Sequence, residues 1–290
     1  MFHRICITAL TVLLSVTASA DTIRMAVTDL VGLESLQREF GQFVETLEQK
    51  TGDTIEFYPV TNRTAAVEAL RFKQVDFVMT GPAEYVVINK RTEAKIVAGF
   101  SRPDYFASVI TLADSRFTSP ATLAGEKVAF GSVGSTSKHL GPMQAIADYG
   151  VTPADYEPIH TKLPIAWESL KRGDVAAIGM NHLNFLTLRE QEQANGGLPP
   201  GAFRVIARGP DLPNDVLMAG AHVSDEVIER YRNAFIEHSD ELIAAILFGE
   251  DNQKYAGMQF LLALDDEDYN YVRAMYDTAG YPEYADFIGD

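Results

Sequence analysis

The chain has 290 residues, 47% of them hydrophobic, and its 24 lysines and arginines face 40 aspartates and glutamates, a formal charge of −16. At roughly 150 residues per domain this length predicts two domains, and the composition is that of a globular protein. The acidic balance argues against a nucleic-acid partner, because phosphate backbones are bound by lysine and arginine. It also argues against docking on an anionic membrane. A small anion remains compatible, because a pocket can be positive inside an acidic envelope.

Residues 1–20 have the sequence MFHRICITALTVLLSVTASA, which is typical of a secretory signal peptide. A basic start and an apolar stretch precede the small residues 18–20 (ASA), which form a cleavage site. The apolar stretch is shorter than the ~20 residues that a membrane span needs. We therefore expect export to the periplasm and a mature chain that begins at Asp21. That chain lacks Cys6, the only cysteine, and so has neither a disulfide nor a thiolate metal ligand.

Short apolar strands alternate with helical segments through the first part of the mature chain. The pattern predicts strands at 23–27, 54–60, 75–79 and 95–100, with helices at 35–50, 64–72 and 82–90. This βαβ alternation predicts a parallel sheet covered by helices on both faces.

The alternation breaks twice, near 101–105 and near 208–216. Between the breaks we expect strands at 105–112, 127–131, 156–160, 175–179 and 203–207, with helices after 137 and at 164–172 and 182–193. A strand at 214–221 and an acidic helical region from Ser224 follow. We therefore predict a two-lobed α/β fold with two interlobe crossings: residues 21–102 and 213–290 form lobe one, and 103–212 form lobe two. Ligands usually bind in such a cleft, where hinge closure traps them.

The loop at 131–137 (GSVGSTS) carries the sharpest local signal, because it follows a strand and opens a helix. Ser135, Thr136 and Ser137 gather hydroxyl and backbone N–H donors at a helix N-terminus, where the partial charge is positive. Two interpretations remain open from the spacing alone: an anion-binding loop, and an ordinary helix N-cap. The loop does not match the GxxxxGK[ST] pattern of nucleotide-binding phosphate loops.

Five segments resemble, in the same order, motifs of the phosphonate-, phosphite- and phosphate-binding proteins of ABC importers. They are AAVEALRFKQVDFVMTGPAEY before residue 86, PDYFASVI at 103–110, KVAFGSVGSTS at 127–137, LKRGDVA at 170–176 and LPNDVL at 212–217. The resemblance implies a class-II periplasmic binding fold, a tetrahedral oxyanion in the interlobe cleft and a permease partner in the inner membrane. The sequence has no GxSxG motif and no HxxxH pair, so we expect neither an enzyme nor a metal or cofactor site.

The resemblance also implies roles for individual residues. Ser135, Thr136 and Ser137 match the family's anion-binding motif. Tyr85 matches a tyrosine that faces the ligand, unless it is a core tyrosine on a helix face. Arg63 stands where the family carries another tyrosine. A guanidinium there would hold an oxyanion through two hydrogen bonds, unless Arg63 is a solvated residue at a helix end.

The family's lobe-two histidine is matched by His160, although the interval from His160 to Gly173 is longer than in the family, and a surface or core histidine is the alternative. Asn181 and His182 stand where members that bind aminoalkyl phosphonates carry carboxylates. Neither side chain neutralises an ammonium, so we expect a smaller or fully anionic ligand bound with the help of Asn181. Asp211 and Asp215 lie near the second crossing and are further candidates for the ligand site; the alternative for Asp215, in the segment PND, is a turn and strand-cap residue.

Three further functions compete with import by a monomeric receptor. The same pocket would serve a periplasmic sensor that reports to a membrane histidine kinase, or a receptor for another organic anion. Tyrosines near the C-terminus would serve ferric iron, but their helical spacing favours packing in the core. These tyrosines are Tyr269, Tyr271, Tyr276, Tyr281 and Tyr284.

Overall fold

The computed structural model describes residues 21–28 and 30–283. The predicted signal peptide, residues 1–20, lies outside the described residues. Within the described part of the chain, no helix has both the length and the hydropathy that crossing a membrane requires.

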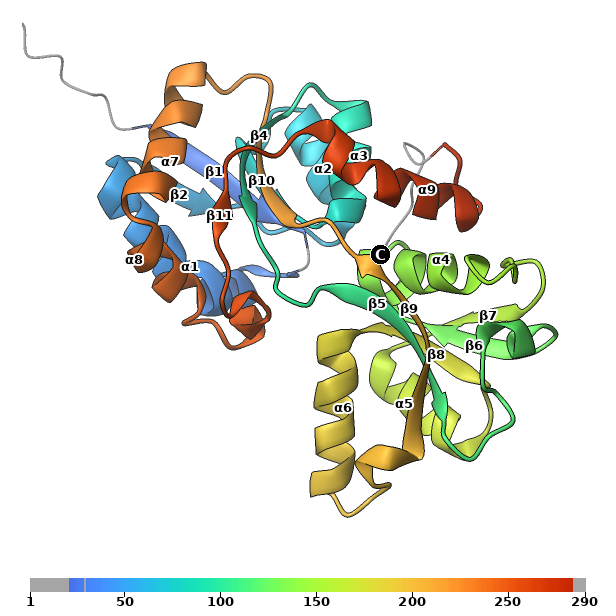
Figure 1. The fold of residues 1–290 in the computed structure, drawn as a ribbon. Helices are drawn as coiled ribbons and strands as arrows, with labels where there is room; N and C mark the ends of the chain where they lie inside the picture. Colours follow the sequence, from blue (N-terminus) through green and yellow to red (C-terminus); the bar gives the residue numbers. More distant parts are fainter. Residues whose placement is uncertain (1–20, 29, 284–290) are drawn as a thin grey trace, which may run out of the picture.

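The first sheet has six strands in the order β11-β4-β10-β3-β1-β2 (Figure 1). The strands are β1 (Thr22–Val27), β2 (Thr54–Phe57), β3 (Phe77–Thr80), β4 (Lys95–Phe100), β10 (Asp215–Ala219) and β11 (Phe260–Leu261). β1 pairs in parallel with β2 and β3, whereas β10 lies between β3 and β4 and is antiparallel to both. The predicted parallel arrangement holds for β1, β2 and β3, whereas the later strands β10 and β11 are antiparallel to their neighbours. β10 returns from the other lobe, so it runs against the strands that lead toward that lobe.

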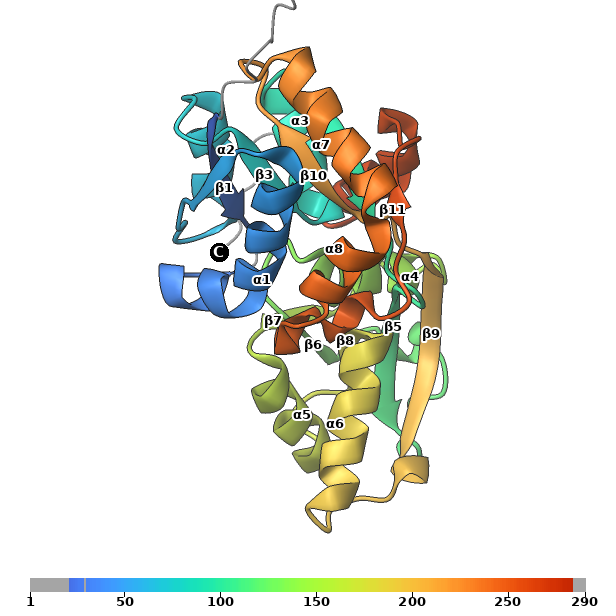
Figure 2. The same cartoon turned by 90° about the vertical axis from the view of Figure 1, so that its left-hand side faces the viewer.

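Helices cover both faces of this sheet. α1 (Leu33–Thr51), α7 (Asp225–Glu237) and α8 (Ser239–Ile246) share one apolar cluster with one face. α2 (Arg63–Arg71), α3 (Pro82–Arg91) and α9 (Asn270–Thr278) share a second cluster with the other face. Figure 2 shows α1, α7 and α8 in front of the sheet. The amphipathic spacing of α1, with Leu36, Phe40, Phe43 and Leu47 buried, places a continuous apolar stripe on the sheet.

The second sheet has five strands in the order β7-β6-β8-β5-β9. They are β5 (Phe106–Leu112), β6 (Lys127–Phe130), β7 (Glu157–His160), β8 (Ala177–Asn181) and β9 (Phe203–Asp211). Successive residues on one strand point to opposite faces. Val109 packs with α4 (Gly141–Ala147), whereas Ile110 packs with α5 (Leu163–Arg172) and α6 (His182–Ala194).

The chain passes from the first sheet to the second between β4 and β5, and it returns between β9 and β10. The two crossings lie side by side at the centre of the molecule (Figure 1). The predicted two-lobed α/β fold is confirmed. The exact lobe boundaries, at 102/103 and 212/213, stay a prediction.

A second connection between the lobes is made by α9, which packs against α4 of lobe two (Figure 1). Val272 and Met275 of α9 share an apolar cluster with Leu140 of lobe two. The Thr278 hydroxyl donates a hydrogen bond to Gln144 Oε1 at 2.5 Å. The lobes are thus in contact beside the crossings as well as through them.

Candidate functional site

A cavity of about 280 Å³ lies between the two lobes. Residues of both lobes and of the first crossing form its wall: Arg63, Gly81, Glu84, Arg102, Tyr105, Ser135, Thr136, Ser137, Lys138, Asn181, Leu183, Asn184, Asp215, Asp251 and Lys254. Five of the seven residues predicted to bind ligand are among them: Ser135, Thr136, Ser137, Arg63 and Asn181.

The lobe-two wall begins where β6 ends. Gly134 has φ +81°, a left-handed conformation that glycine adopts without strain, and it turns the chain into a π-helical segment, Thr136–Leu140. The Ser135 carbonyl accepts hydrogen bonds from the N–H groups of His139 and Leu140. In the described chain this helix start has no side-chain cap, so the N-cap interpretation of the serine and threonine hydroxyls is not supported. The three hydroxyl side chains are instead buried in the cavity wall.

Two of these hydroxyls already accept a hydrogen bond. Ser137 Oγ accepts from Asn181 Nδ2 at 3.1 Å, and Asn181 Oδ1 accepts from the N–H of Asn184 at 2.8 Å, which fixes the amide orientation. Thr136 Oγ1 accepts from the N–H of Ala83 at 3.0 Å, across the cleft. A hydroxyl that accepts from one partner keeps its own proton for another. Both side chains can therefore donate to an oxyanion.

The lobe-one wall is built from ion pairs. Arg63, the first residue of α2, pairs with Glu84 in the first turn of α3, and their side chains are only 11% and 4% exposed. Asn62 caps α2 by accepting a hydrogen bond from the N–H of Ala65 at 2.8 Å, which sets the direction in which this helix begins. Arg63 is thus a buried wall residue, and the interpretation as a solvated helix-end arginine is wrong.

The second pair joins Arg102, in the first crossing, to Asp215, the first residue of β10. Arg102 Nη1 lies 3.5 Å from Asp215 Oδ1, and the guanidinium carbon lies 3.6 Å from the centre of the Tyr105 ring. Asp215 Oδ2 accepts a hydrogen bond from the Tyr255 hydroxyl at 2.6 Å. Asp215 is therefore a buried ion-pair partner at the cavity, as the first of its two sequence interpretations has it, and not only a turn and strand-cap residue.

The charges of the wall favour an anion. Four cationic and three acidic side chains line the cavity, so its formal charge is positive within a chain of charge −16. The cations beyond the two ion pairs are Lys138 and Lys254. An anion is concentrated by such a locally positive cleft with low-dielectric walls.

Tyr85 does not line this cavity, contrary to the expectation from the family motif. Its side chain is buried toward the C-terminal segment: the hydroxyl donates to Asp266 Oδ1 at 3.0 Å and the ring centre lies 3.9 Å from that of Tyr269. Burial, with the Asp266 carboxylate, raises the pKa of Tyr85 well above its usual value. Successive residues of a helix are about 100° apart. The turn of α3 that brings Glu84 to the cavity therefore directs Tyr85 elsewhere.

His160 does not line the cavity either, and its neighbour His139 explains why. His160 ends the edge strand β7, and its Nδ1 donates to the Gly131 carbonyl at 3.1 Å. The His139 ring lies 4.6 Å from it and accepts the N–H of Gly134 at Nδ1, 2.9 Å away. Burial, with a smaller effect of His160, lowers the pKa of His139 to about 3. Both histidines thus hold the loop behind the hydroxyl wall.

Sequence reasoning did not select Arg102 and Lys254. The break in the βαβ pattern around Arg102 could have indicated this residue, because a segment that crosses between the lobes necessarily lies next to the cleft. Lys254 has no local signal. Its 3-10 helix, Glu250–Tyr255, is brought to the cavity by Glu39, whose Oε2 accepts from the N–H of Asp251 and whose carbonyl accepts from Asn252 Nδ2, both at 2.8 Å.

Four of the five C-terminal tyrosines, Tyr269, Tyr271, Tyr276 and Tyr281, are described by the structure and do not line the cavity. The Tyr269 hydroxyl donates to the Asn214 carbonyl at 3.0 Å, and the Tyr276 hydroxyl donates to the Ala83 carbonyl at 3.1 Å. Tyr284 lies outside the described residues. Among residues 21–28 and 30–283, no three His, Cys, Asp or Glu side chains group as metal ligands.

Comparison with known proteins gives a consistent result. A family model described as "ABC transporter, phosphonate, periplasmic substrate-binding protein" matches residues 32–269. The phosphate-import protein PhnD of Mycolicibacterium smegmatis is 24% identical over 236 residues, which are 76% of this chain and 73% of that protein.

Two solved structures are similar over nearly the whole chain. One is a binding protein component of an ABC phosphonate transporter from Pseudomonas aeruginosa, with a TM-score of 0.66 and 18% identity over 91% of this chain and 88% of that one. The other is PhnD1 from Prochlorococcus marinus in complex with methylphosphonate, with a TM-score of 0.61 and 17% identity over 90% of this chain and 98% of that one. At these identities the likeness establishes the fold.

Proposed function

Because this chain belongs to the family of periplasmic substrate-binding proteins of phosphonate ABC transporters, we propose that its interlobe cavity binds a phosphorus oxyanion for import. The observation that supports this role best is the cavity itself, in which the buried hydroxyls of Ser135, Thr136 and Ser137 share one space with Arg63 and Arg102. A tetrahedral oxyanion accepts several hydrogen bonds at once and is attracted by both guanidinium groups.

The proposed division of labour follows the two walls. The lobe-two hydroxyls donate hydrogen bonds to the oxyanion. Ser137 Oγ accepts a hydrogen bond from Asn181 and Thr136 Oγ1 accepts one from Ala83, so the hydroxyl protons of both residues remain available for the anion. The lobe-one arginines supply positive charge, which Glu84 and Asp215 partly neutralise. A bound anion shares the guanidinium groups with these carboxylates, and the hydroxyls fix its position.

The proposed ligand is a phosphate, a phosphite or a simple alkylphosphonate, without an amine. Asn181 donates a hydrogen bond to Ser137 through Nδ2 and accepts one from the N–H of Asn184 at Oδ1. Its amide is uncharged and its oxygen is already hydrogen-bonded, so it does not neutralise an ammonium. Glu84 and Asp215 are engaged by Arg63 and Arg102. A protonated amine would have to compete with a buried guanidinium for either carboxylate.

Lobe closure provides the signal to the transporter. The hydrogen bond from Ala83 to Thr136 already spans the cleft, and a bound anion adds contacts to both walls. A ligand shifts closure only by its greater affinity for the closed form. We propose that the closed monomer, exported to the periplasm by its signal peptide, docks on an inner-membrane permease. It releases the anion there without chemical conversion, and neither a metal nor a cofactor takes part.

Thermal melting of the mature chain with a panel of anions tests this function. The panel contains phosphate, phosphite, methylphosphonate, 2-aminoethylphosphonate, sulfate and ferric citrate. A ligand at about one hundred times its dissociation constant stabilises the fold by roughly 2.7 kcal/mol, which melting detects. We expect a shift with a phosphorus oxyanion and a smaller one with 2-aminoethylphosphonate. A shift with sulfate or ferric citrate alone would contradict the assignment.

A further inference from the structure

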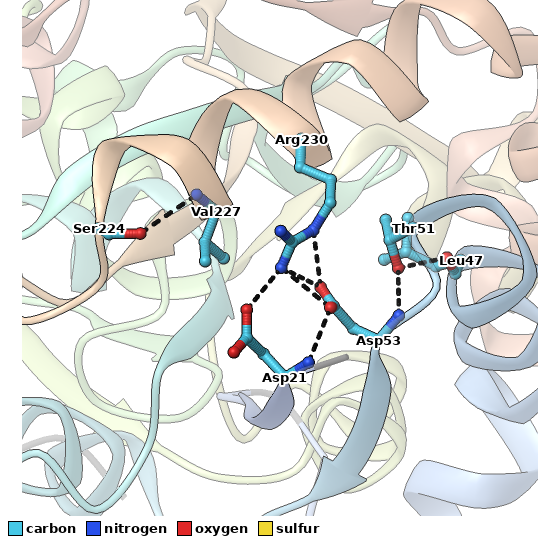
Figure 3. Close-up of polar contacts among 7 residues, drawn as sticks. All are labelled: Asp21, Leu47, Thr51, Asp53, Ser224, Val227 and Arg230. Carbon is cyan, nitrogen blue, oxygen red and sulfur yellow. Dashed lines mark hydrogen bonds and ion pairs between the residues drawn. The ribbon is translucent and has the colours of Figure 1, made fainter. Parts of the chain in front are cut away.

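The first described residue, Asp21, lies in a closed arrangement of charged groups (Figure 3). Its backbone nitrogen donates a hydrogen bond to Asp53 Oδ1 at 3.1 Å. Its carbonyl accepts a hydrogen bond from the N–H of Thr54 at 2.9 Å. The next residue, Thr22, begins β1 and pairs in register with Thr54 of β2. The sheet therefore fixes where the nitrogen of Asp21 lies.

Arg230 of α7 binds both carboxylates of this cluster. Its Nη2 lies 2.7 Å from Asp21 Oδ2 and 2.9 Å from each oxygen of Asp53, and its Nε lies 3.1 Å from Asp53 Oδ2. Figure 3 shows the guanidinium pointing from α7 toward the two aspartates. The Asp53 side chain is only 1% exposed. The Asp21 carboxylate is 46% exposed and is therefore partly solvated, so the group that depends on protein partners is the buried Asp53 carboxylate. The two carboxylates and one guanidinium carry a formal charge of −1, and a buried carboxylate is costly unless its oxygens are paired.

The sequence places the predicted cleavage site at this nitrogen, because residues 18–20 (ASA) immediately precede Asp21. Hydrolysis of the peptide bond between Ala20 and Asp21 consumes one water molecule. It leaves a carboxylate on Ala20 and an amine on Asp21, and the amine takes up a proton at neutral pH. The amide nitrogen that donates to Asp53 then becomes an ammonium.

We propose that Asp53 is a preformed docking site for the α-ammonium of Asp21, and that removal of the signal peptide completes the charge of the Asp21–Asp53–Arg230 cluster. One added positive charge brings the cluster to neutrality. Cleavage one residue later would remove Asp21, and cleavage one residue earlier would leave a neutral amide against Asp53. Only a chain that begins at Asp21 therefore places its α-ammonium at Asp53, and removal of the signal peptide strengthens the attachment of β1 to the fold.

The ammonium contributes to stability only while it is protonated. An unperturbed α-amino group has a pKa of about 8, and a carboxylate partner raises that pKa in the folded state. The gain is therefore complete below about pH 8 and is lost as the pH rises through the raised value. Other titratable groups face the same end of β1 from neighbouring elements. Asp76, His222 and Glu226 line the adjoining cavity with Arg230, and the buried Tyr231 of α7 interacts with Asp53.

The test compares two purified chains in urea unfolding. One begins exactly at Asp21 and the other retains Ala20 after an initiator Met. At pH 7 we expect the folding equilibrium constant of the Asp21 chain to be about tenfold larger, because a hydrogen bond to a charged group replaces one from an amide. The difference should disappear at pH 10. Equal stability of the two chains at pH 7, or a difference that persists at pH 10, would overturn the proposal.

Asp53→Asn in both chains identifies the partner, and Asp225→Asn is the matched control because Asp225 is an exposed carboxylate on the same helix as Arg230. Asp53→Asn should remove the difference between the chains, and Asp225→Asn should preserve it. Should Asp53→Asn prevent folding, the wild-type comparison at the two pH values still decides. The intact mass of the exported chain must correspond to an N-terminal Asp21. Anion-induced melting shifts should be the same for both chains, so failure here is distinct from failure of the proposed function.

Discussion

The two walls of the interlobe cavity achieve recognition in different ways. The lobe-two wall contributes neutral donors, the hydroxyls of Ser135, Thr136 and Ser137, which lie within one turn of the chain and which we call the neutral wall; Lys138 beside them adds one positive charge. The lobe-one wall is charged but balanced: Arg63 with Glu84 and Arg102 with Asp215 come from four separate segments. Neutral donors are buried at little cost once they have partners, whereas each buried charge needs an opposite charge beside it. The hydroxyl groups are therefore positioned by one short segment of the chain, whereas the ion pairs form only when the separate segments of lobe one are folded together.

The largest effect is expected from breaking a pair of the charged wall. Arg63→Ala leaves the Glu84 carboxylate buried without its guanidinium, which should lower the free energy of unfolding by about 3–5 kcal/mol. Urea unfolding measures the loss. Arg71→Ala is the matched control, because Arg71 lies on the same helix in an exposed pair with Glu68 and should cost at most about 1 kcal/mol.

The double variant Arg63→Met/Glu84→Leu separates pairing from anion binding. Replacing both members of a buried pair by apolar residues of similar size is often neutral, so most of the stability should return. Affinity for phosphate and methylphosphonate should stay low. Equal, small losses from Arg63→Ala and Arg71→Ala would show that the charged wall is not a buried ion pair in solution.

The neutral wall is tested by Thr136→Val, which keeps the shape and removes the hydroxyl. The variant loses one donor to the anion and the acceptor for the N–H of Ala83. A hydrogen bond to a charged group contributes about 1.5–3 kcal/mol, so affinity should fall about 10- to 150-fold in isothermal titration with the best anion of the panel. Thr136→Ser should retain most of it. Thr46→Val, on α1 outside the cavity wall, should bind normally. Unchanged binding by Thr136→Val would remove the lobe-two wall from the site.

The same difference explains what could be predicted from the sequence. The hydroxyl wall was visible because strand, glycine turn and helix start are consecutive, and the family motif covers them. The charged wall was only partly visible, since Arg102 and Asp215 are 113 positions apart and meet only where two crossings run side by side. Tyr85 was misplaced because a motif gives spacing along the chain, whereas the direction of a side chain depends on where α3 begins. The strand β10 was predicted, but its place in the sheet was not, because no local pattern shows that a returning strand inserts between β3 and β4.

A third, smaller effect concerns the support behind the neutral wall. Burial lowers the pKa of His139 to about 3 from an ordinary value of 6.5, so the folded chain holds this ring neutral while the unfolded chain protonates it. The unfolded state then binds more protons between these pH values, and stability falls as the pH decreases through that window. The slope contributed by one such group approaches about 1.4 kcal/mol per pH unit.

His139→Asn should flatten this part of the pH profile, because an amide oxygen replaces Nδ1 as acceptor for the N–H of Gly134 without titrating. Urea unfolding between pH 4 and pH 7 gives the profile. His238→Asn provides the control, because His238 is a partly exposed histidine that does not line the cavity. A profile of His139→Asn that coincides with that of the wild type would mean that the ring is solvated and that the loop is held by its backbone alone.

The smallest effect is expected from Lys254, which lines the cavity outside the two ion pairs of the charged wall. Lys254 lies in the Glu250–Tyr255 segment with its ammonium 5.0 Å from the centre of the Tyr255 ring, and it lines the cavity while remaining partly exposed. A partly exposed charge acts on the anion through screened attraction, so Lys254→Gln should weaken binding only about two- to fivefold at low salt and less at 0.5 M salt. Lys127→Gln, an exposed lysine of lobe two, should have no effect. A loss that exceeds tenfold and persists at high salt would instead make Lys254 a direct ligand. The anion would then be held chiefly by one lysine of the Glu250–Tyr255 segment and not by the two arginine pairs.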